Sequence, residues 1–281
     1  MFSFQGHCYA SLHEVPPAIL YGFIHHAALT ETIAYVNGHP LFWEEHYLRL
    51  MASMRILRME IPLSFTPEQL LSDAATLCLA LKQPKFTGHI QLRVTKADSP
   101  NNQNPIPSTI YAIEAFEKEH PFLYRREQLP IDLYKDHYLL PGMYASLESS
   151  FITWRNMAWT YVYENGYCDG IVLNEKKQVV ETLNGPLFLV KGNQITTPAL
   201  GIGNRKGIYR QQLISVIQQK TEFELIETEI SPFALQKSDE IIVLKDACGL
   251  NSISQYRKKV FGDRVSKQLW DLFSAHLKGN A

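Results

Sequence analysis

The chain has 281 residues, of which 46% are hydrophobic and 20% are charged, and its formal net charge is −1. These values are typical of a globular protein with a sizeable core, long enough for two modest domains or one large one. With almost no net charge and no long basic run, nothing favours nucleic acid or an acidic membrane surface as a partner.

The four cysteines are widely scattered, with no C-x-x-C pair and no metal-ligand spacing. This pattern indicates free thiols in a reducing cytoplasm and predicts no metal site. No apolar stretch approaches about 20 residues, so we expect no membrane span. The N-terminus lacks the charged region and apolar run of a signal peptide. We therefore expect a cytoplasmic protein.

The first 115 residues alternate between predicted strands and helices. Each helix is predicted from apolar residues at helical spacing, and Pro67 behind Thr66 marks a helix start. A polar loop, DSPNNQNPIP, cannot pair in a sheet. In chain order we predict a strand over 2–10, helices over His46–Met59 and Pro67–Leu81, and strands over Ile90–Val94 and Thr109–Ala115.

A charged stretch with two prolines, FEKEHPFLYRREQLP, follows these elements. We predict that residues 119–124 within it connect a small domain, 1–118, to a larger one, 125–281. The second part is predicted to hold a strand over 129–135, a helix from about 150 to 164, two hairpins, a helix over 207–219, strands near 223–228 and 240–244, and a terminal helix over SKQLWDLFSAHL.

The most informative segment is Asp169–Arg210. Apolar runs on either side of short polar turns predict two consecutive hairpins. Gly207 then opens an apolar helix, and such a helix start presents free backbone N–H groups that suit a phosphate. Glu181, which closes the first hairpin, is placed to meet a cationic ring nitrogen.

This order resembles the class IV aminotransferase family, the pyridoxal-phosphate proteins of fold type IV. Branched-chain and D-amino-acid aminotransferases and aminodeoxychorismate lyases belong to it. The segment matches the family pattern at Glu181, Phe188, Thr197-Pro198 and Gly207-Ile208-Tyr209-Arg210. An earlier block, Thr30–Met54, matches it at Glu31, Thr32, His46, Arg49, Leu50 and Ser53, and the blocks GHIQLRVTKA and KSDEIIVL resemble two further strands of the family.

The resemblance implies an α+β fold of two domains with a cleft between them, and a homodimer. It also implies pyridoxal phosphate as cofactor, with Arg49 and the start of the helix at Gly207, Ile208 and Tyr209 holding the phosphate. Glu181 would pair with the pyridine nitrogen. From the residues alone, Arg49 is equally well a solvated helix residue paired with Glu45.

Several positions depart from the family pattern. The lysine that forms the Schiff base with the cofactor falls on Glu148, and a carboxylate cannot replace an amine nucleophile. Glu148 can also be read as an acid that stabilises a helix start. Where the family has Thr, Asn or Ala beside the phosphate, this chain has Asp246, which would repel a phosphate unless the neighbouring Lys245 compensates.

Two classes of function remain open. In the first, the chain is an active aminotransferase or aminodeoxychorismate lyase that acts on an amino acid or an amino-chorismate, with a substitute amine such as Lys245 or Lys206. In the second, it is a non-catalytic relative that binds a small anion or a protein partner. In either case we expect pyridoxal phosphate to bind poorly and without a covalent bond at Glu148. We also expect Arg49, Glu148, Glu181, Ile208 and Tyr209 to line one concave site.

Overall fold

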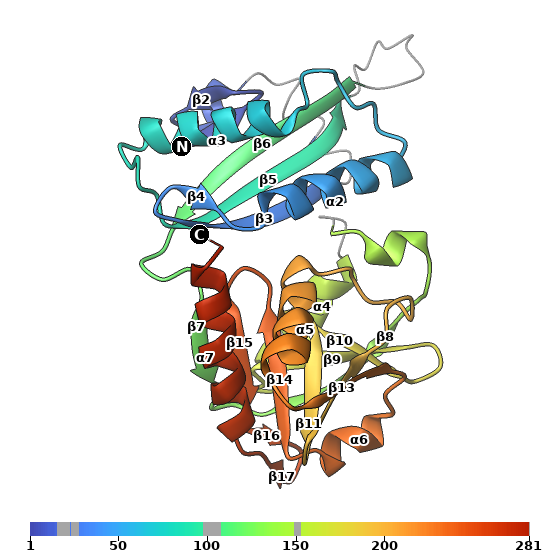
Figure 1. The fold of residues 1–281 in the computed structure, drawn as a ribbon. Helices are drawn as coiled ribbons and strands as arrows, with labels where there is room; N and C mark the ends of the chain where they lie inside the picture. Colours follow the sequence, from blue (N-terminus) through green and yellow to red (C-terminus); the bar gives the residue numbers. More distant parts are fainter. Residues whose placement is uncertain (16–22, 24–27, 98–107, 149–152, 281) are drawn as a thin grey trace. The chain divides into compact units, whose positions relative to one another are not determined.

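The structure is a computed structural model that describes residues 1–15, 23, 28–97, 108–148 and 153–280. These residues fall into two compact units. The first comprises the described residues of Met1–Pro121, Leu147–Phe151 and Asn280–Ala281, and the second those of Phe122–Ser146 and Ile152–Gly279. Each unit combines helices with sheets (Figure 1), which confirms the predicted α+β class.

Unit 1 is built on an antiparallel sheet with the strand order β2-β1-β6-β5-β3-β4. The central pair, β5 and β6, is in register over ten residues. The strands are β1 (Phe2–Phe4), β2 (His7–Tyr9), β3 (Leu29–Val36), β4 (His39–Pro40), β5 (Gly88–Ala97) and β6 (Ser108–Glu117), and a short 3-10 turn, η1, covers Leu12–Glu14.

Two helices, α2 (Trp43–Ile56) and α3 (Pro67–Ala80), pack on this sheet (Figure 1). Residues of both helices share one apolar core with β3, β5 and β6. The Thr66 hydroxyl accepts a hydrogen bond from the backbone N–H of Gln69, so α3 begins as its sequence predicts. The first predicted helix lies within three residues of its expected bounds.

The chain start is a hairpin, so the prediction of one strand over residues 2–10 is wrong. Gln5 and Gly6 both have positive φ, of 49° and 79°. Two such residues form the tight turn that suits a two-residue hairpin, and β2 therefore folds back on β1. The polar loop expected over residues 98–107 lies outside the described residues.

Unit 2 contains two sheets. The five-stranded sheet has the order β10-β9-β8-β16-β17, and the six-stranded sheet has the order β13-β12-β11-β14-β15-β7. The strands are β7 (Leu123–Arg126), β8 (Ile131–Leu139), β9 (Asp169–Asn174), β10 (Val179–Thr182), β11 (Leu187–Lys191), β12 (Gln194–Pro198), β13 (Glu224–Thr228), β14 (Glu240–Lys245), β15 (Gly249–Ile253), β16 (Gln255–Tyr256) and β17 (Lys259–Val260).

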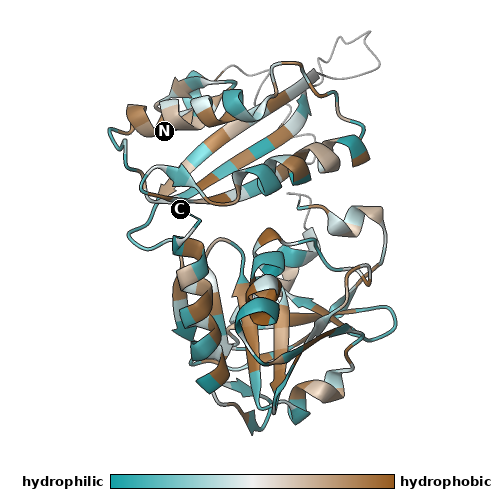
Figure 2. Cartoon of the chain, in the orientation of Figure 1, coloured by the Kyte–Doolittle hydropathy of each residue, from teal (hydrophilic) through white to brown (hydrophobic). Residues whose placement is uncertain are grey.

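The two sheets share one core, because a single cluster of buried residues draws on β8 and β9 from one sheet and on β11 and β14 from the other. Figure 2 shows the apolar character of β11 and β14. The remaining elements are η2 (Met143–Ser146) and the helices α4 (Thr153–Glu164), α5 (Ile208–Lys220), α6 (Pro232–Lys237) and α7 (Arg264–Lys278).

Both predicted hairpins are present, as β9 with β10 and β11 with β12. The segment that we expected to connect the domains differs, because Leu123 and Tyr124 belong to β7. This strand pairs in parallel with β15, more than 120 residues further along the chain. A pairing so distant in sequence leaves no local pattern, and neither β7 nor β15 nor α6 was predicted.

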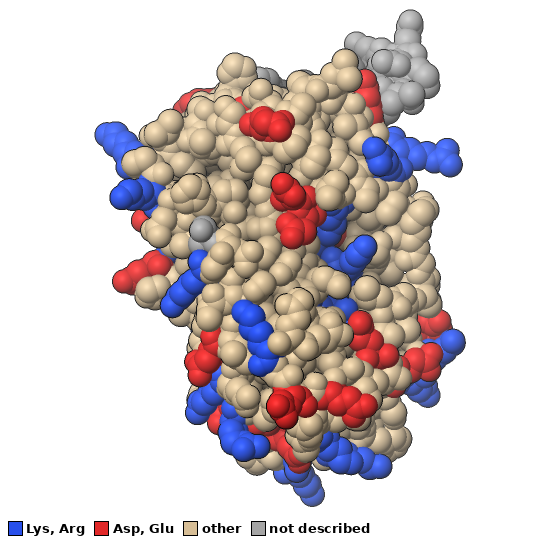
Figure 3. Space-filling model, viewed as in Figure 1, with Lys and Arg blue, Asp and Glu red and all other residues tan. Residues whose placement is uncertain are grey.

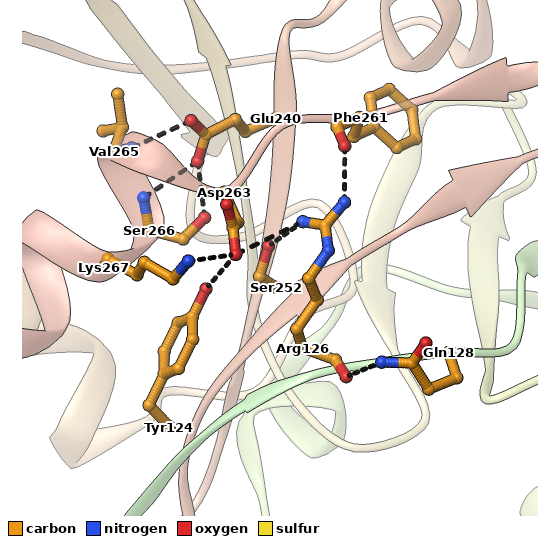
Figure 4. Close-up of polar contacts among 10 residues, drawn as sticks. All are labelled: Tyr124, Arg126, Gln128, Glu240, Ser252, Phe261, Asp263, Val265, Ser266 and Lys267. Carbon is orange, nitrogen blue, oxygen red and sulfur yellow. Dashed lines mark hydrogen bonds and ion pairs between the residues drawn. The ribbon is translucent and has the colours of Figure 1, made fainter.

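The start of α7 is held by a buried acid on β14 (Figure 4). Glu240 accepts hydrogen bonds from the backbone N–H groups of Val265 and Ser266, both at 2.8 Å, and from the Ser266 hydroxyl at 2.6 Å. Nearby, Lys267 pairs with Asp263 at 2.9 Å. A carboxylate at this position satisfies helix N–H groups that have no partner within the helix and complements the helix dipole.

Three further observations concern the surface charges, the helices and the candidate metal ligands. Acidic and basic side chains are interspersed over the face drawn in Figure 3. No helix in the described part of the chain combines the length and apolar character needed to cross a membrane. Among the same residues, no group of three His, Cys, Asp or Glu side chains is arranged to hold a metal ion.

Candidate functional site

Glu181 lies on β10 in unit 2, and its side chain is only 3% exposed. The strand is irregular here, because the register with β9 shifts between Val179 and Glu181. Such a bulge places an extra residue in one strand and re-aims the side chain that follows. The carboxylate that the family resemblance singled out thus lies directly after this irregularity.

Two arginines hold this carboxylate. Oε1 of Glu181 accepts hydrogen bonds from Nη2 of Arg155 at 3.2 Å and from Nε of Arg205 at 3.0 Å. Oε2 accepts one from the backbone N–H of Arg205 at 3.2 Å. A carboxylate has about four acceptor positions, and three are in use. The acid is thus bound by two guanidinium groups of its own unit.

Arg205 reaches Glu181 from the loop between β12 and α5. The loop is braced by Asn204, whose side chain accepts from the backbone N–H of Gly201 at 3.2 Å and donates to the carbonyl of Ala199 at 3.0 Å. Asn174 donates to the carbonyl of Ile202 at 3.3 Å. These bonds fix the backbone that leads into Arg205.

Arg155 comes from the first turn of α4, where it shares the buried helix face with Ala158 and Val162. Its guanidinium also lies 5.2 Å from the centroid of the Trp154 ring. Sequence reasoning missed both arginines. For Arg155 the available signal was its helical spacing with Ala158 and Val162, at i, i+3 and i+7. An arginine on an apolar helix face requires a buried partner.

The helix α5 begins directly after Gly207, where the sequence predicted a helix start. Gly207 precedes the helix and has no side chain to cap it, so the first N–H groups point outward from the helix end. Ile208 and Tyr209 are buried, at 8% and 2% exposure. The Tyr209 ring packs on Phe122 at a centroid distance of 5.3 Å. Tyr209 therefore contributes backbone to the helix start and its ring to the core.

Asp246 lies beside this helix start. A methyl group placed on Gly207 would be 3.6 Å from Oδ1 of Asp246. The acid follows β14 in a tight turn closed by a bond from the Cys248 N–H to the Lys245 carbonyl at 3.0 Å. Ala247 in that turn has a φ of 53°. Lys245 ends β14 and is half-buried. The structure thus brings Asp246 and Gly207 together, as the sequence comparison implied.

Arg49 lies in unit 1 and is engaged by an acid. Its Nε and Nη2 donate to the two oxygens of Glu31 at 2.9 and 2.6 Å. Nδ1 of His46 donates to the same carboxylate at 2.7 Å. Burial by itself would raise the pKa of Glu31, but Arg49 and His46 outweigh it and hold the pKa below its usual value. Arg49 pairs with Glu31 across the fold, not with Glu45 in its own helix.

Burial has the opposite effect on the neighbouring imidazole. It lowers the pKa of His46, although the bond to Glu31 works in the other direction. The His46 proton that binds Glu31 is on Nδ1, because a carboxylate only accepts hydrogen bonds. The charge of Glu31 is balanced chiefly by Arg49.

Glu148, at the expected lysine position, belongs to unit 1. Its carbonyl accepts a hydrogen bond from the backbone N–H of Thr30 at 2.9 Å. Thr30 immediately precedes Glu31 on β3. Residue 148 is therefore hydrogen-bonded to the strand whose Glu31 binds Arg49. The candidate residues thus form one group in unit 1 and one in unit 2. Whether the two groups line a single site stays a prediction.

Residues 28–256 match the protein family described as Amino-transferase class IV. The chain belongs to this family. The match spans most of the sequence and includes every candidate residue above.

Individual relatives are distant in sequence and close in fold. A probable branched-chain-amino-acid aminotransferase from Aquifex aeolicus is 23% identical over 127 residues, which are 44% of this chain and 41% of that protein. The branched-chain aminotransferase of Thermobaculum terrenum, solved in its PLP form, has a TM-score of 0.79 at 18% identity and covers 100% of this chain and 94% of its own. The 4-amino-4-deoxychorismate lyase of Pseudomonas aeruginosa has a TM-score of 0.76 at 20% identity, covering 99% of both chains.

The residues present do not fit pyridoxal phosphate. A protonated pyridine nitrogen needs an anion beside it, yet the charge of Glu181 is already shared by Arg155 and Arg205. The carboxylate of Asp246 stands at the helix start where a phosphate would bind. Residue 148 offers no amine.

Proposed function

We propose that this chain is a non-catalytic member of the class IV amino-transferase family that binds a small anionic ligand and does not convert it by Schiff-base chemistry. The observation that carries the proposal is the ion-paired cluster of Glu181 with Arg155 and Arg205. The family resemblance implies that this acid pairs with the ring nitrogen of the cofactor. Here two side chains of the same unit engage it.

Glu148 supports the same proposal independently. A Schiff base requires an amine, and the family's lysine position holds a carboxylate. The fold itself is retained over its full extent. Because a fold by itself does not fix an activity, the retained scaffold is compatible with a binding role in place of catalysis.

The alternative is an active enzyme with a substitute amine. Lys245 favours it, because it ends an otherwise buried strand directly before Asp246. Lys206, next to Gly207, is the second candidate. Either lysine would have to carry the cofactor in place of residue 148.

Borohydride reduction in the presence of pyridoxal phosphate, followed by peptide mapping, distinguishes the two functions. We expect no lysine to carry a stoichiometric pyridoxyl group, and no turnover of branched-chain amino acids or of 4-amino-4-deoxychorismate, the substrates named for the relatives. The Thermobaculum terrenum enzyme is the positive control. One stoichiometric label at Lys245 or Lys206, lost in the corresponding Lys→Arg variant, would establish the enzyme instead.

Ligand binding is tested separately by thermal unfolding with a panel of amino acids, keto acids and inorganic phosphate. We expect a stabilising shift with at least one anion, because a ligand that binds only the folded state raises its stability. We further propose that the protein acts as a homodimer, as its family resemblance implies. Light scattering after size-exclusion chromatography would give twice the chain mass of 32.2 kDa.

A further inference from the structure

Arg155 and Arg205 are buried arginines of unit 2 to which the family resemblance assigns no role. Both donate to the same oxygen of Glu181, and Arg205 adds its backbone N–H to the other oxygen. We propose that Arg205 is a built-in cation that takes the place of the cofactor's ring nitrogen, and that Asp246 is a built-in anion that takes the place of its phosphate. The cofactor site is then filled by the chain itself.

The first part of this proposal, that Arg205 replaces the ring nitrogen, is argued from the charges around Glu181. A carboxylate favours a protonated ring nitrogen because it supplies negative potential at hydrogen-bond distance. With a guanidinium already 3.0 Å from Oε1, a protonated ring beside Glu181 would face a like charge at close range. The ring would bind less tightly and would lose the proton that makes it an electron sink.

The loop that carries Arg205 is built to hold it there. Asn204 closes the loop on itself through Ala199 and Gly201, and the Arg205 backbone is bonded to Glu181 together with its side chain. The Arg205 side chain is only 13% exposed. An exposed arginine that formed an incidental ion pair with Glu181 would not need a loop held by these hydrogen bonds.

The second part of the proposal, that Asp246 replaces the phosphate, is argued from its position at the start of α5. Its Oδ1 is 3.6 Å from the position that a Cβ on Gly207 would take, at the start of a 13-residue helix. The positive end of a helix attracts one anion, and a second anion beside Asp246 would be repelled. The two parts predict separate effects on the two ends of one ligand.

The test uses pyridoxine 5′-phosphate, which has the ring and the phosphate but no aldehyde, so that only non-covalent recognition is measured. Binding to the full chain is titrated by calorimetry. We expect Arg205→Met to tighten binding at least tenfold over the unmodified protein. Arg126→Met is the matched control, because Arg126 is an arginine of the same unit that pairs with Asp263 at 3.7 Å, on other elements than Glu181 and the start of α5. It should leave the affinity unchanged.

Two further variants test which residue acts on the ring and which acts on the phosphate. In the double variant Arg205→Met/Glu181→Gln the gain in affinity should disappear, because it depends on the negative charge of Glu181. Asp246→Asn should tighten inorganic phosphate at least tenfold, whereas Arg205→Met should not alter phosphate binding. Since Arg155 and the backbone N–H of residue 205 still bond to Glu181 in Arg205→Met, the fold should persist. Thermal unfolding verifies this, and Arg205→Gln serves as a second variant.

The inference rests on the proposed function, but the two can fail separately. Tight binding of pyridoxine 5′-phosphate by the unmodified protein would overturn the inference and leave a non-catalytic protein standing. No tightening in folded Arg205→Met or Arg205→Gln would overturn it as well. A stoichiometric pyridoxyl-lysine in the unmodified protein would overturn the proposed function through a different readout.

Discussion

Replacing Asp169 by Asn should change how the stability of unit 2 depends on pH. Asp169 begins β9 and is 2% exposed. Its Oδ1 accepts from the backbone N–H groups of Gly170 at 2.8 Å and Leu183 at 3.1 Å, and its Oδ2 accepts from the Asn184 amide at 3.0 Å. Burial raises the pKa of Asp169 from 3.8 to about 6, although hydrogen bonds from Thr182, Asn184 and Gly170 oppose the rise.

The sign follows from proton binding. The folded protein holds the Asp169 proton more tightly than the unfolded chain does, so this group's contribution to stability is complete below pH 3.8 and is lost as the pH rises through 6. The full loss is about 3 kcal/mol, at 1.36 kcal/mol for each pKa unit. Between pH 4.5 and pH 7 it amounts to about 2 kcal/mol.

Asn at this position does not titrate, and its amide oxygen still accepts from Gly170 and Leu183. The free energy of unfolding of Asp169→Asn minus that of the unmodified protein should therefore rise by about 2 kcal/mol from pH 4.5 to pH 7, whatever the constant offset between them. Urea unfolding followed by tryptophan fluorescence reports chiefly on unit 2, which holds Trp154, Trp159 and Trp270. Two parallel pH profiles would refute the reasoning.

Three further substitutions test the contacts that hold each unit. Glu240→Ala removes three hydrogen bonds from the start of α7 and should cost about 3 kcal/mol in urea unfolding, whereas Glu224→Ala on an exposed strand position should cost under about 0.5 kcal/mol. Equal costs would contradict the capping role. Glu31→Gln leaves the charge of Arg49 without its buried partner and should cost about 3 kcal/mol, and an unchanged melting temperature would argue against that pairing. Asn204→Ala should cost about 1–2 kcal/mol and speed proteolysis of the loop before α5, and equal cleavage rates would show that Asn204 does not brace it.

Local patterns were sufficient for the elements whose cause is local. Thr66 followed by Pro67 predicts the start of α3, because a capping hydroxyl and a proline act within one helical turn. The hairpins of β9 with β10 and β11 with β12 were predicted because each joins neighbouring apolar runs through a short polar turn. The opening strand was mispredicted for a local reason too, since the turn at Gln5-Gly6 was overlooked.

The sequence by itself determined the family, because the matching motifs depend on residue identity and order, and the resemblance in turn implied the α+β class. That the family's lysine falls on Glu148 stays a prediction. Only the tertiary structure decided that β7 joins a sheet through β15, and that Glu181 is engaged by Arg155 and Arg205. The acid is 26 residues from Arg155 and 24 from Arg205 along the chain. A hydrogen bond extends about 3 Å, so partners this far apart in sequence meet only once the chain has folded.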